Sequence, residues 1–208
     1  MLEWRYPDKP QSATSEFLSF IKEDEWYSTS KLDGWRMNVY TDKDKNAQLF
    51  TRVGNLIQNA TKVPLPLVKA VSQLCENIPA LSVLDCEFVG PRGGHQPAVY
   101  LFDVMAWDGN WLNAVPFESR WQLAETEVNR FIVPGSNVHM VETVTSGFMD
   151  HFNLLKQIWY NGGCSTLDLH EGIVLKRKKG VLTLSLQTSV KSRHLIKIKY
   201  RDARRPTY

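Results

Sequence analysis

The stretch WYSTSKLDGWRMNVYTD, residues 26–42, shapes the interpretation of the whole chain. β-Branched and aromatic residues stand on both sides of the pair Asp33-Gly34, and an Asp-Gly pair between such runs is typical of a tight turn. The pattern therefore predicts two strands joined by a short turn. Lys31 would lie at the end of the first strand, immediately before that turn.

The flanking segments contain more strand patterns than helix patterns. Strand-like runs occupy residues 47–57, 81–90, 98–109, 171–178, 181–188 and 194–201, with a glycine-rich loop at 91–97. Helical periodicity marks residues 14–23, 66–78, 117–130 and 148–160. Because several strands are linked by short turns, we expect an α+β fold of two largely antiparallel sheets with peripheral helices.

The composition indicates a folded domain outside the membrane. Hydrophobic residues make up 43% of the 208 residues, and no run of about 18 apolar residues occurs. The first residues form no apolar signal region. Cys75, Cys86 and Cys164 are an odd, widely spaced set, which argues for a reducing compartment. We therefore expect a cytoplasmic protein, of a bacterial or phage-infected cell, and a monomer.

Charge is distributed unevenly along the chain. Residues 176–208 contain eleven Lys and Arg against one acid, 11 − 1 = +10, so residues 1–175 carry 14 basic and 21 acidic groups, 14 − 21 = −7. A strongly basic segment on an acidic body favours a polyanionic partner. The alternative is a basic tail that is merely solvated.

Lys31 is the first candidate for chemistry. A lysine amine beside a turn can act as a covalent nucleophile once it has lost its proton. An ordinary lysine, with a pKa near 10.4, is almost wholly protonated at neutral pH, so cationic neighbours or a divalent metal would be needed to favour the neutral amine. Taken alone, Lys-x-Asp-Gly is also common in structural hairpins.

Charged pairs on two later strands are further candidates. Side chains two residues apart share one face of a strand, so Asp85 with Glu87 and Lys197 with Lys199 each form such a pair. The carboxylates suit a metal, a ribose hydroxyl or acid–base chemistry, and the lysines suit phosphate. The alternatives are a solvated strand face and an edge strand protected by lysines.

Glu171 and Lys176 bracket an apolar strand, Glu-Gly-Ile-Val-Leu-Lys. They have opposite parity, so in a regular strand they would face opposite sides. A carboxylate at the strand's start is able to hold Mg²⁺ near phosphates. An ordinary buried strand with charged ends is the alternative.

Order along the chain makes these segments more specific together than singly. The lysine motif at 31–36, the acidic strand at 85–87, the Glu-Gly strand at 171–176 and the Lys-x-Lys strand at 197–199 follow one another in a spacing that resembles the covalent nucleotidyltransferase superfamily of DNA ligases, RNA ligases and mRNA capping enzymes. The resemblance covers most of the chain, from about residue 26 to 199. It implies an adenylation domain with the nucleotide site between its two sheets, ATP as cofactor and Mg²⁺ or Mn²⁺.

The resemblance also implies roles for single residues. Lys31 would be catalytic and form the covalent bond to AMP. Arg52, in Thr51-Arg-Val-Gly54, would bind the 5′-phosphate of the nucleic acid, and Glu171 and Glu87 would bind metal. The nucleotide would be bound by Arg36, Glu87, Phe102 stacked on adenine, Lys176, Lys197 and Lys199.

Within the superfamily, residues 100–121 (YLFDVMAWDGNWLNAVPFESRW) most resemble ATP-dependent DNA ligases. Two features depart from that pattern. Ser28-Thr29-Ser30 precedes the lysine where many relatives have an acidic residue, and nine residues follow Lys199 where DNA ligases carry an oligonucleotide-binding domain. We therefore expect residues 1–208 to form an adenylation domain without a C-terminal domain of that kind.

The function expected from the sequence is that of a minimal ATP-dependent DNA ligase, which seals 5′-phosphate/3′-hydroxyl nicks through lysyl-AMP in DNA repair or replication. An RNA ligase is the main alternative. A capping guanylyltransferase and a non-catalytic nucleic-acid-binding module are less favoured. The expected partner is nicked duplex DNA, with RNA or an RNA/DNA hybrid as alternatives, and no membrane is involved.

Overall fold

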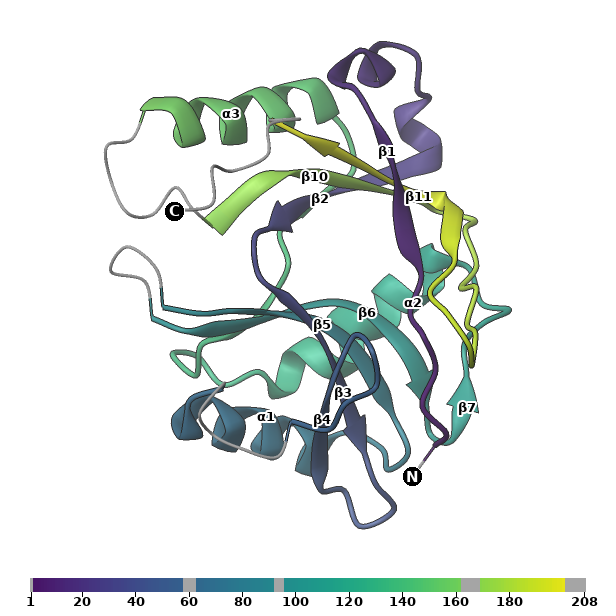
Figure 1. The fold of residues 1–208 in the computed structure, drawn as a ribbon, viewed down its shortest axis with the longest axis vertical. Helices are drawn as coiled ribbons and strands as arrows, with labels where there is room; N and C mark the ends of the chain where they lie inside the picture. Colours follow the sequence, from purple (N-terminus) through teal and green to yellow (C-terminus); the bar gives the residue numbers. More distant parts are fainter. Residues whose placement is uncertain (1, 58–62, 92–95, 162–168, 201–208) are drawn as a thin grey trace.

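Two twisted sheets face each other in the computed structural model, which describes residues 2–57, 63–91, 96–161 and 169–200 (Figure 1). One sheet has the order β1-β11-β10-β2-β9 and the other β4-β3-β5-β6-β7, with β8 beside β6. Neighbouring strands are antiparallel except in the pairs β1–β11 and β6–β8. The expected α+β fold of two largely antiparallel sheets is therefore confirmed.

The elements have the following bounds. The first sheet contains β1 (Lys9–Ala13), β2 (Trp26–Leu32), β9 (Thr143–Val144), β10 (His170–Arg177) and β11 (Lys191–Lys199). The second contains β3 (Trp35–Thr41), β4 (Ala47–Thr51), β5 (Val83–Val89), β6 (Ala98–Trp107), β7 (Asn110–Trp111) and β8 (Val138–Met140). The α-helices are α1 (Leu65–Asn77), α2 (Phe117–Leu123) and α3 (Phe148–Asn161), and the short 3₁₀ or π helices are η1 (Ser15–Ser19), η2 (Glu23–Glu25), η3 (Ala124–Val128) and η4 (Asn129–Phe131).

The helices α1 and α3 cover the outer faces of the two sheets, whereas α2 contacts β6 of one sheet and β10 of the other. On the six-stranded sheet, α1 buries Leu67, Val71 and Leu74 in the same apolar cluster as Met37 and Leu84. On the five-stranded sheet, the buried α3 residues Phe148, Phe152 and Leu155 pack with Ile173, Leu175 and Ile198. Burial of apolar side chains on the outer faces frees the inner faces for polar ones.

In the described part of the chain, no helix is both long and apolar enough to cross a membrane.

The expected hairpin at residues 26–42 is wrong. Strands β2 and β3 belong to different sheets, and the chain crosses between the sheets at Asp33-Gly34. The Asp33 N–H donates to the carbonyl of Leu169, 2.8 Å away, rather than closing a turn. A Cβ on Gly34 would overlap the Phe88 carbonyl oxygen and lie 2.8 Å from Cγ of Glu87. Glycine is needed here for a close approach of backbones.

Other expected elements differ in extent. Residues 181–188 form no strand beyond one bridge between Tyr6 and Ser185, and the helix expected at 14–23 is the short turn η1. The helix expected at 117–130 is confirmed as helical backbone, in which α2 is followed without a break by the π-helix η3 and the 3₁₀ helix η4. The helices expected at 66–78 and 148–160 are confirmed as α1 and α3. Most of the glycine-rich loop, Cys164 and residues 201–208 lie outside the described residues.

The N-terminal segment, which the sequence patterns did not indicate, spans both sheets. Strand β1 is an edge strand of the five-stranded sheet, where it pairs with β11, and the residues before it reach down to the six-stranded sheet (Figure 1). There the Arg5 N–H donates to the Tyr40 hydroxyl at 3.3 Å, and the Trp4 ring lies against Gly54. The segment therefore links the two sheets at the side opposite the β2–β3 crossing.

Candidate active site

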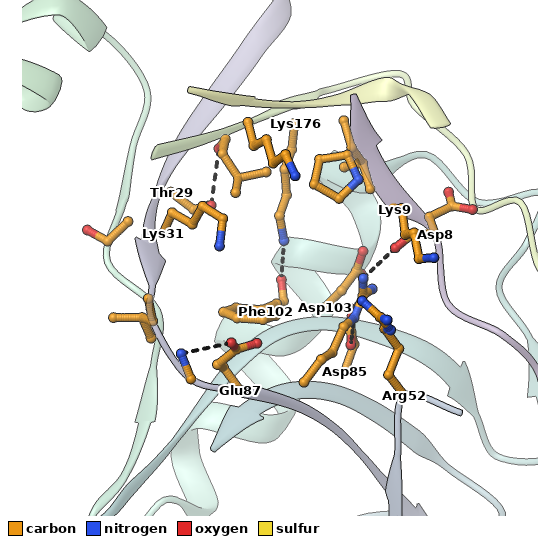
Figure 2. Close-up of a pocket in the computed structure, with 18 of the residues that line it drawn as sticks. Asp8, Lys9, Thr29, Lys31, Arg52, Asp85, Glu87, Phe102, Asp103 and Lys176 are labelled. Atoms are coloured by element: carbon orange, nitrogen blue, oxygen red, sulfur yellow. Dashed lines mark hydrogen bonds and ion pairs between the residues drawn. The ribbon is translucent and has the colours of Figure 1, made fainter. Parts of the chain in front are cut away.

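A cavity of about 390 Å³ lies between the inner faces of the sheets, within the size range of small-molecule sites (Figure 2). Its lining from the five-stranded sheet includes Thr29, Lys31, Val174, Lys176, Lys191 and Lys197, and from the six-stranded sheet Arg36, Asp85, Glu87, Phe102 and Asp103. Arg52 and the N-terminal residues Asp8 and Lys9 complete its rim. The cavity therefore gathers most of the charged residues that the sequence motifs singled out.

Lys31 projects into this cavity from the end of β2 (Figure 2). Its side chain is 19% exposed, and its amine forms an ion pair with Oε1 of Glu171. The other Glu171 oxygen accepts a hydrogen bond from the Lys199 amine at 2.6 Å. One carboxylate thus joins the lysine of the first motif to a lysine of the last.

The position of Glu171 depends on an irregularity in β10. The pairing of β10 with β2 shifts register between His170 and Gly172, and Gly172 has φ +148°. A Cβ on Gly172 would overlap the Ile198 carbonyl oxygen and lie 2.8 Å from Cα of Lys199. In a regular strand, the Glu171 and Lys176 side chains would face opposite sides of the sheet. The strand is not regular here, and Glu171 therefore contacts both Lys31 and Lys199 beside the cavity.

Lys197 and Lys199 share one face of β11, as the alternation of strand side chains predicts, while Ile198 between them is fully buried. Lys197 lines the cavity. Burial lowers the pKa of Lys197, and the neighbouring charges of Lys199 and Lys31 lower it further. The three lysines therefore form a cationic cluster whose mutual repulsion a bound polyphosphate would relieve.

Arg36 faces the cavity from β3, and its guanidinium is held by the Asp85 carboxylate and by a backbone carbonyl. Its Nε and Nη2 donate to the two Asp85 oxygens at 2.8 and 2.5 Å, and its Nη1 donates to the backbone carbonyl of Asp8. Burial lowers the pKa of Arg36, but the ion pair and hydrogen bonds with Asp85, together with the charges of Glu87 and Asp8, raise it overall. A bidentate pair of this kind fixes the guanidinium in one orientation.

Glu87 lies beside the β2–β3 crossing and accepts a hydrogen bond from the Gly34 N–H at 3.2 Å (Figure 2). The residue is 8% exposed. Burial raises the pKa of Glu87 to about 7, although the charges of Lys31 and Arg36 lower it in part. Its protonation therefore changes near neutral pH, in direct electrostatic contact with Lys31.

Phe102 and Lys176 meet across the cavity. The Lys176 amine donates to the Phe102 carbonyl oxygen at 2.8 Å and lies 4.6 Å from the centre of the Phe117 ring. Lys176 is 6% exposed, and burial lowers its pKa to about 8. The Lys176 amine is thus held by the backbone of β6, while the Phe102 ring lines the cavity.

Three acids and bases of this region were missed by the sequence motifs. Asp8 is 1% exposed, accepts the Thr183 N–H at 3.0 Å, and has its pKa raised by burial to about 6. Asp103 binds Arg120 through two bonds of 2.9 and 2.8 Å, and Arg120 is 2% exposed. The partner of Asp8 lies far along the chain, so no local signal marks it, whereas Asp103 and Arg120 both lie in the stretch 100–121, where the sequence analysis gave them no role.

The residues that precede Lys31 divide between the two faces of β2. Thr29 lines the cavity and donates to the Val174 carbonyl oxygen at 3.1 Å. Ser28 lies 3.1 Å from Nδ1 of the buried His151, and Ser30 donates to Glu142 at 2.8 Å. The serine side chains therefore anchor the strand from its other face, although Ser30 also contributes to the lining of the cavity.

Arg52 follows β4 at the edge of the cavity and is exposed. Within the described residues it has no ion pair or hydrogen bond of its side chain. No group of three or more His, Cys, Asp and Glu side chains able to hold a metal occurs in those residues either. Glu87 and Glu171 supply single carboxylates, which fits Mg²⁺ held by one or two carboxylates together with substrate phosphates.

Solved structures of DNA ligases resemble this fold. The ligase domain of M. tuberculosis LigD matches with a TM-score of 0.66 and 17% identity, over 93% of this chain and 59% of that one. A mycobacterial DNA ligase D complexed with ATP and MES matches at 0.63 and 18%, over 94% and 60%. The Chlorella virus DNA ligase-adenylate matches at 0.57 and 17%, over 92% and 67%. The chain thus spans about three-fifths of the first two.

The comparison with curated proteins gave no match. The model of the RNA ligase family matches residues 24–199, which contain every residue that the sequence motifs assigned to the site. The matched region contains the lysine, glutamate and Lys-x-Lys motifs and most of the residues that line the cavity, whereas Asp8 and Lys9 precede it. The chain therefore belongs to the RNA ligase family.

Proposed function

We propose that this protein is an ATP-dependent polynucleotide ligase that works through a covalent bond between Lys31 and AMP. The observation that carries the proposal is the placement of the Lys31 amine in a nucleotide-sized cavity, beside Glu171 and a cluster of cationic side chains. An ATP complex of a mycobacterial DNA ligase D with the same fold supports the choice of nucleotide.

In the first step the neutral Lys31 amine attacks the α-phosphorus of ATP. A nitrogen–phosphorus bond forms, the bond from that phosphorus to the β-phosphate oxygen breaks, pyrophosphate leaves, and the nitrogen loses one proton, for which the Glu171 carboxylate beside the amine is an acceptor. Lys197 and Lys199 stand where they would neutralise the phosphates. Glu171 must exchange its present contacts with Lys31 and Lys199 as the nucleotide enters.

A divalent ion fits this arrangement. Glu87 and Glu171 would hold Mg²⁺ or Mn²⁺ together with the phosphates of the nucleotide, and the ion would add positive charge where pyrophosphate departs. Phe102 would stack on the adenine, and Arg36, already fixed by Asp85, would contact the ribose or the phosphates. Lys176 would support the base through the Phe102 backbone.

In the next steps AMP passes to the 5′-phosphate of a nucleic acid, and a 3′-hydroxyl then displaces AMP to form the phosphodiester. Arg52, exposed at the rim of the cavity, would bind that 5′-phosphate. We propose nicked duplex DNA as the first substrate, because the three solved structures compared above are DNA ligases or a ligase domain. RNA is the second candidate, because the matching family model describes RNA ligases.

The covalent step is tested with α-labelled ATP and a divalent metal, followed by denaturation of the protein. We expect label to remain on the wild-type chain and to be lost in Lys31→Ala, while Lys43→Ala, an exposed lysine remote from the cavity, keeps it. A preparation freed of bound AMP by prior incubation with pyrophosphate that takes up no label would contradict the proposal. So would label that persists in Lys31→Ala.

The substrate is tested by a chase of the labelled protein. Nicked DNA, nicked RNA, an RNA/DNA hybrid and single-stranded RNA are offered in parallel, each with a 5′-phosphate. Faster sealing of nicked DNA supports the first candidate, and faster sealing of either RNA substrate supports the second. Labelled protein that transfers AMP to none of these ends would contradict the ligase assignment while leaving the adenylylation step intact.

A further inference from the structure

A second cavity, of about 340 Å³, adjoins the first where β3 begins and β4 ends. Its lining is largely apolar and includes the side chains or backbone of Trp35, Met37, Val53, Ile57, Val63 and Phe88. Gly34, Arg36 and Arg52 line both cavities, so the two are neighbours. The proposed chemistry of the first cavity makes no use of the second.

Trp35 is the most distinctive residue of this cavity. It is 60% exposed, although it begins β3 and the next residue on the same strand face, Met37, is 1% exposed. Its ring meets Phe88 edge-on, with the ring centres 6.2 Å apart and an interplanar angle of 62°. One face of the indole is therefore not required for packing within the described part of the chain.

Arg52 gives this apolar cavity a charged neighbour. Its side chain lines both cavities, and it has no acidic partner among the described residues. Val53, next to it in the chain, is 51% exposed and lines only the second cavity. An aromatic face, an apolar floor and one cation fit a nucleotide, whose base is flat and apolar on its faces and whose phosphate is anionic.

We propose that the second cavity binds an unstacked nucleobase, that of the nucleotide whose phosphate Arg52 holds. The inference rests on the proposed function and deepens it, because it names how the enzyme recognises the end to be joined. The base would stack on Trp35 while its phosphate stays at Arg52, between the two cavities. A base in this cavity leaves its place in a helical stack, so the terminal nucleotide is bound in an opened conformation.

The position of Arg52 favours a nucleotide over a protein partner. An apolar side chain of a protein would fill the cavity without needing a cation at the border with the proposed ATP site. A nucleotide end needs both, since its phosphate must approach the Lys31 cavity to receive AMP. Stacking is tolerant of sequence, so the cavity would accept any of the bases.

The test compares two 5′-phosphorylated single strands that differ only at the terminal nucleotide, one with a base and one abasic. The full chain is titrated with each, for the wild type, Trp35→Ala, Trp35→Phe and Phe20→Ala. Phe20 is the control because it is 82% exposed and belongs to the segment of η1, on the other sheet. Uptake of labelled AMP from ATP is measured separately for every variant.

We expect the wild type and Phe20→Ala to bind the strand with a base about 5- to 140-fold more tightly than the abasic strand, the range for one stacked base. Trp35→Ala should bind both strands equally, and Trp35→Phe should keep part of the preference. AMP uptake should stay within about twofold in all four proteins, because Trp35 does not line the first cavity.

Wild-type protein that binds the two strands equally, or that binds neither, would overturn the inference. So would a base preference that Trp35→Ala retains. These results are independent of the label on Lys31, whose absence would overturn the proposed function instead. A folded Trp35→Ala protein, shown by its unchanged AMP uptake, excludes simple unfolding as the cause of lost preference.

Discussion

Glu87 combines deep burial with the nearby charges of Lys31 and Arg36. Burial raises its pKa from the ordinary 4.5 to about 7, so the folded protein favours the protonated form. The contribution of Glu87 to stability is therefore fully present below pH 4.5 and is lost as the pH rises through 7. The loss is about 3 kcal/mol, from 1.36 kcal/mol per pKa unit.

We predict that Glu87→Gln removes this pH dependence. The amide keeps the size of the side chain and an oxygen to accept the Gly34 N–H, but it does not ionise. Urea unfolding at pH 5 and pH 8 should show the variant gaining stability on the wild type at the higher pH. The comparison between the two proteins cancels other groups with raised pKa values, such as Asp8. An equal pH dependence in both proteins would refute the prediction.

Arg120 and Asp103 form a buried ion pair, with both side chains at most 6% exposed. Removing one partner leaves the other charge buried and alone, which costs about 3–5 kcal/mol. We predict that Arg120→Ala lowers the free energy of unfolding by that amount and that Arg120→Ala with Asp103→Ala recovers part of it. Denaturant titration measures both. A single substitution that costs under about 1 kcal/mol would show that the pair is not needed for folding.

Candidate site residues could be predicted from the sequence where they belong to a short motif. Lys31, Glu87 and Lys197 stand out by residue type and spacing, and the structure brings them to one cavity. Asp8 was not found, because its partner Thr183 is far away in the sequence, and Asp103, although it stands in the stretch 100–121, was given no role because its pairing with Arg120 is not visible from residue types. A buried acid next to apolar residues looks the same in sequence whether or not such a partner exists.

At the scale of elements, the close approach of β10 to β11 at Gly172 is tested by adding a methyl group to that residue. Gly172 has φ +148°, and a Cβ there would overlap the Ile198 carbonyl oxygen. We predict that Gly172→Ala disturbs the pairing of β10 with β11, displaces Glu171 from Lys31, and lowers AMP uptake together with stability. Labelled-ATP uptake and thermal unfolding measure the two effects.

Gly135→Ala is the matched control for that substitution. Gly135 also has a positive φ, +79°, but a Cβ there would meet nothing within 4 Å. It should cost only the backbone strain of a left-handed alanine, about 1–2 kcal/mol, and leave AMP uptake unchanged. Equal losses in the two variants would show that strain, and not the contact with β11, explains the effect at Gly172.

Elements were predicted well where periodicity and burial agree, and less well where pairing decides. The helix α1 follows from its apolar positions, whereas residues 26–42 show two strands correctly but not that they belong to different sheets. An Asp-Gly pair is compatible with a tight turn and with a crossing between two sheets. The contacts that show the crossing, between Asp33 and Leu169 and between Gly34 and Phe88, join residues far apart in the sequence and are not visible in it. Residues 181–188 alternate like a strand, yet Leu182 and Leu184 pack on an apolar cluster without a partner strand.

For the molecule as a whole, the polarised charge predicts how nucleic-acid binding responds to salt. Lys191 is exposed on β11 and lines the rim of the first cavity. If it contacts a phosphate, Lys191→Ala should reduce the slope of log affinity against log salt by about 0.7–0.9. Binding titrations at several salt concentrations measure the slope. Lys43→Ala, on the remote β3–β4 turn, should leave it unchanged, and an unchanged slope in Lys191→Ala would exclude that contact.

The chain passes between the sheets after Lys31, again between β8 and β9, and also through the segment before β1. Neither sheet is therefore an autonomous folding unit, since each borrows backbone from a connection that ends in the other. Heating should consequently melt the molecule in one cooperative calorimetric transition, with the van't Hoff enthalpy equal to the enthalpy measured directly.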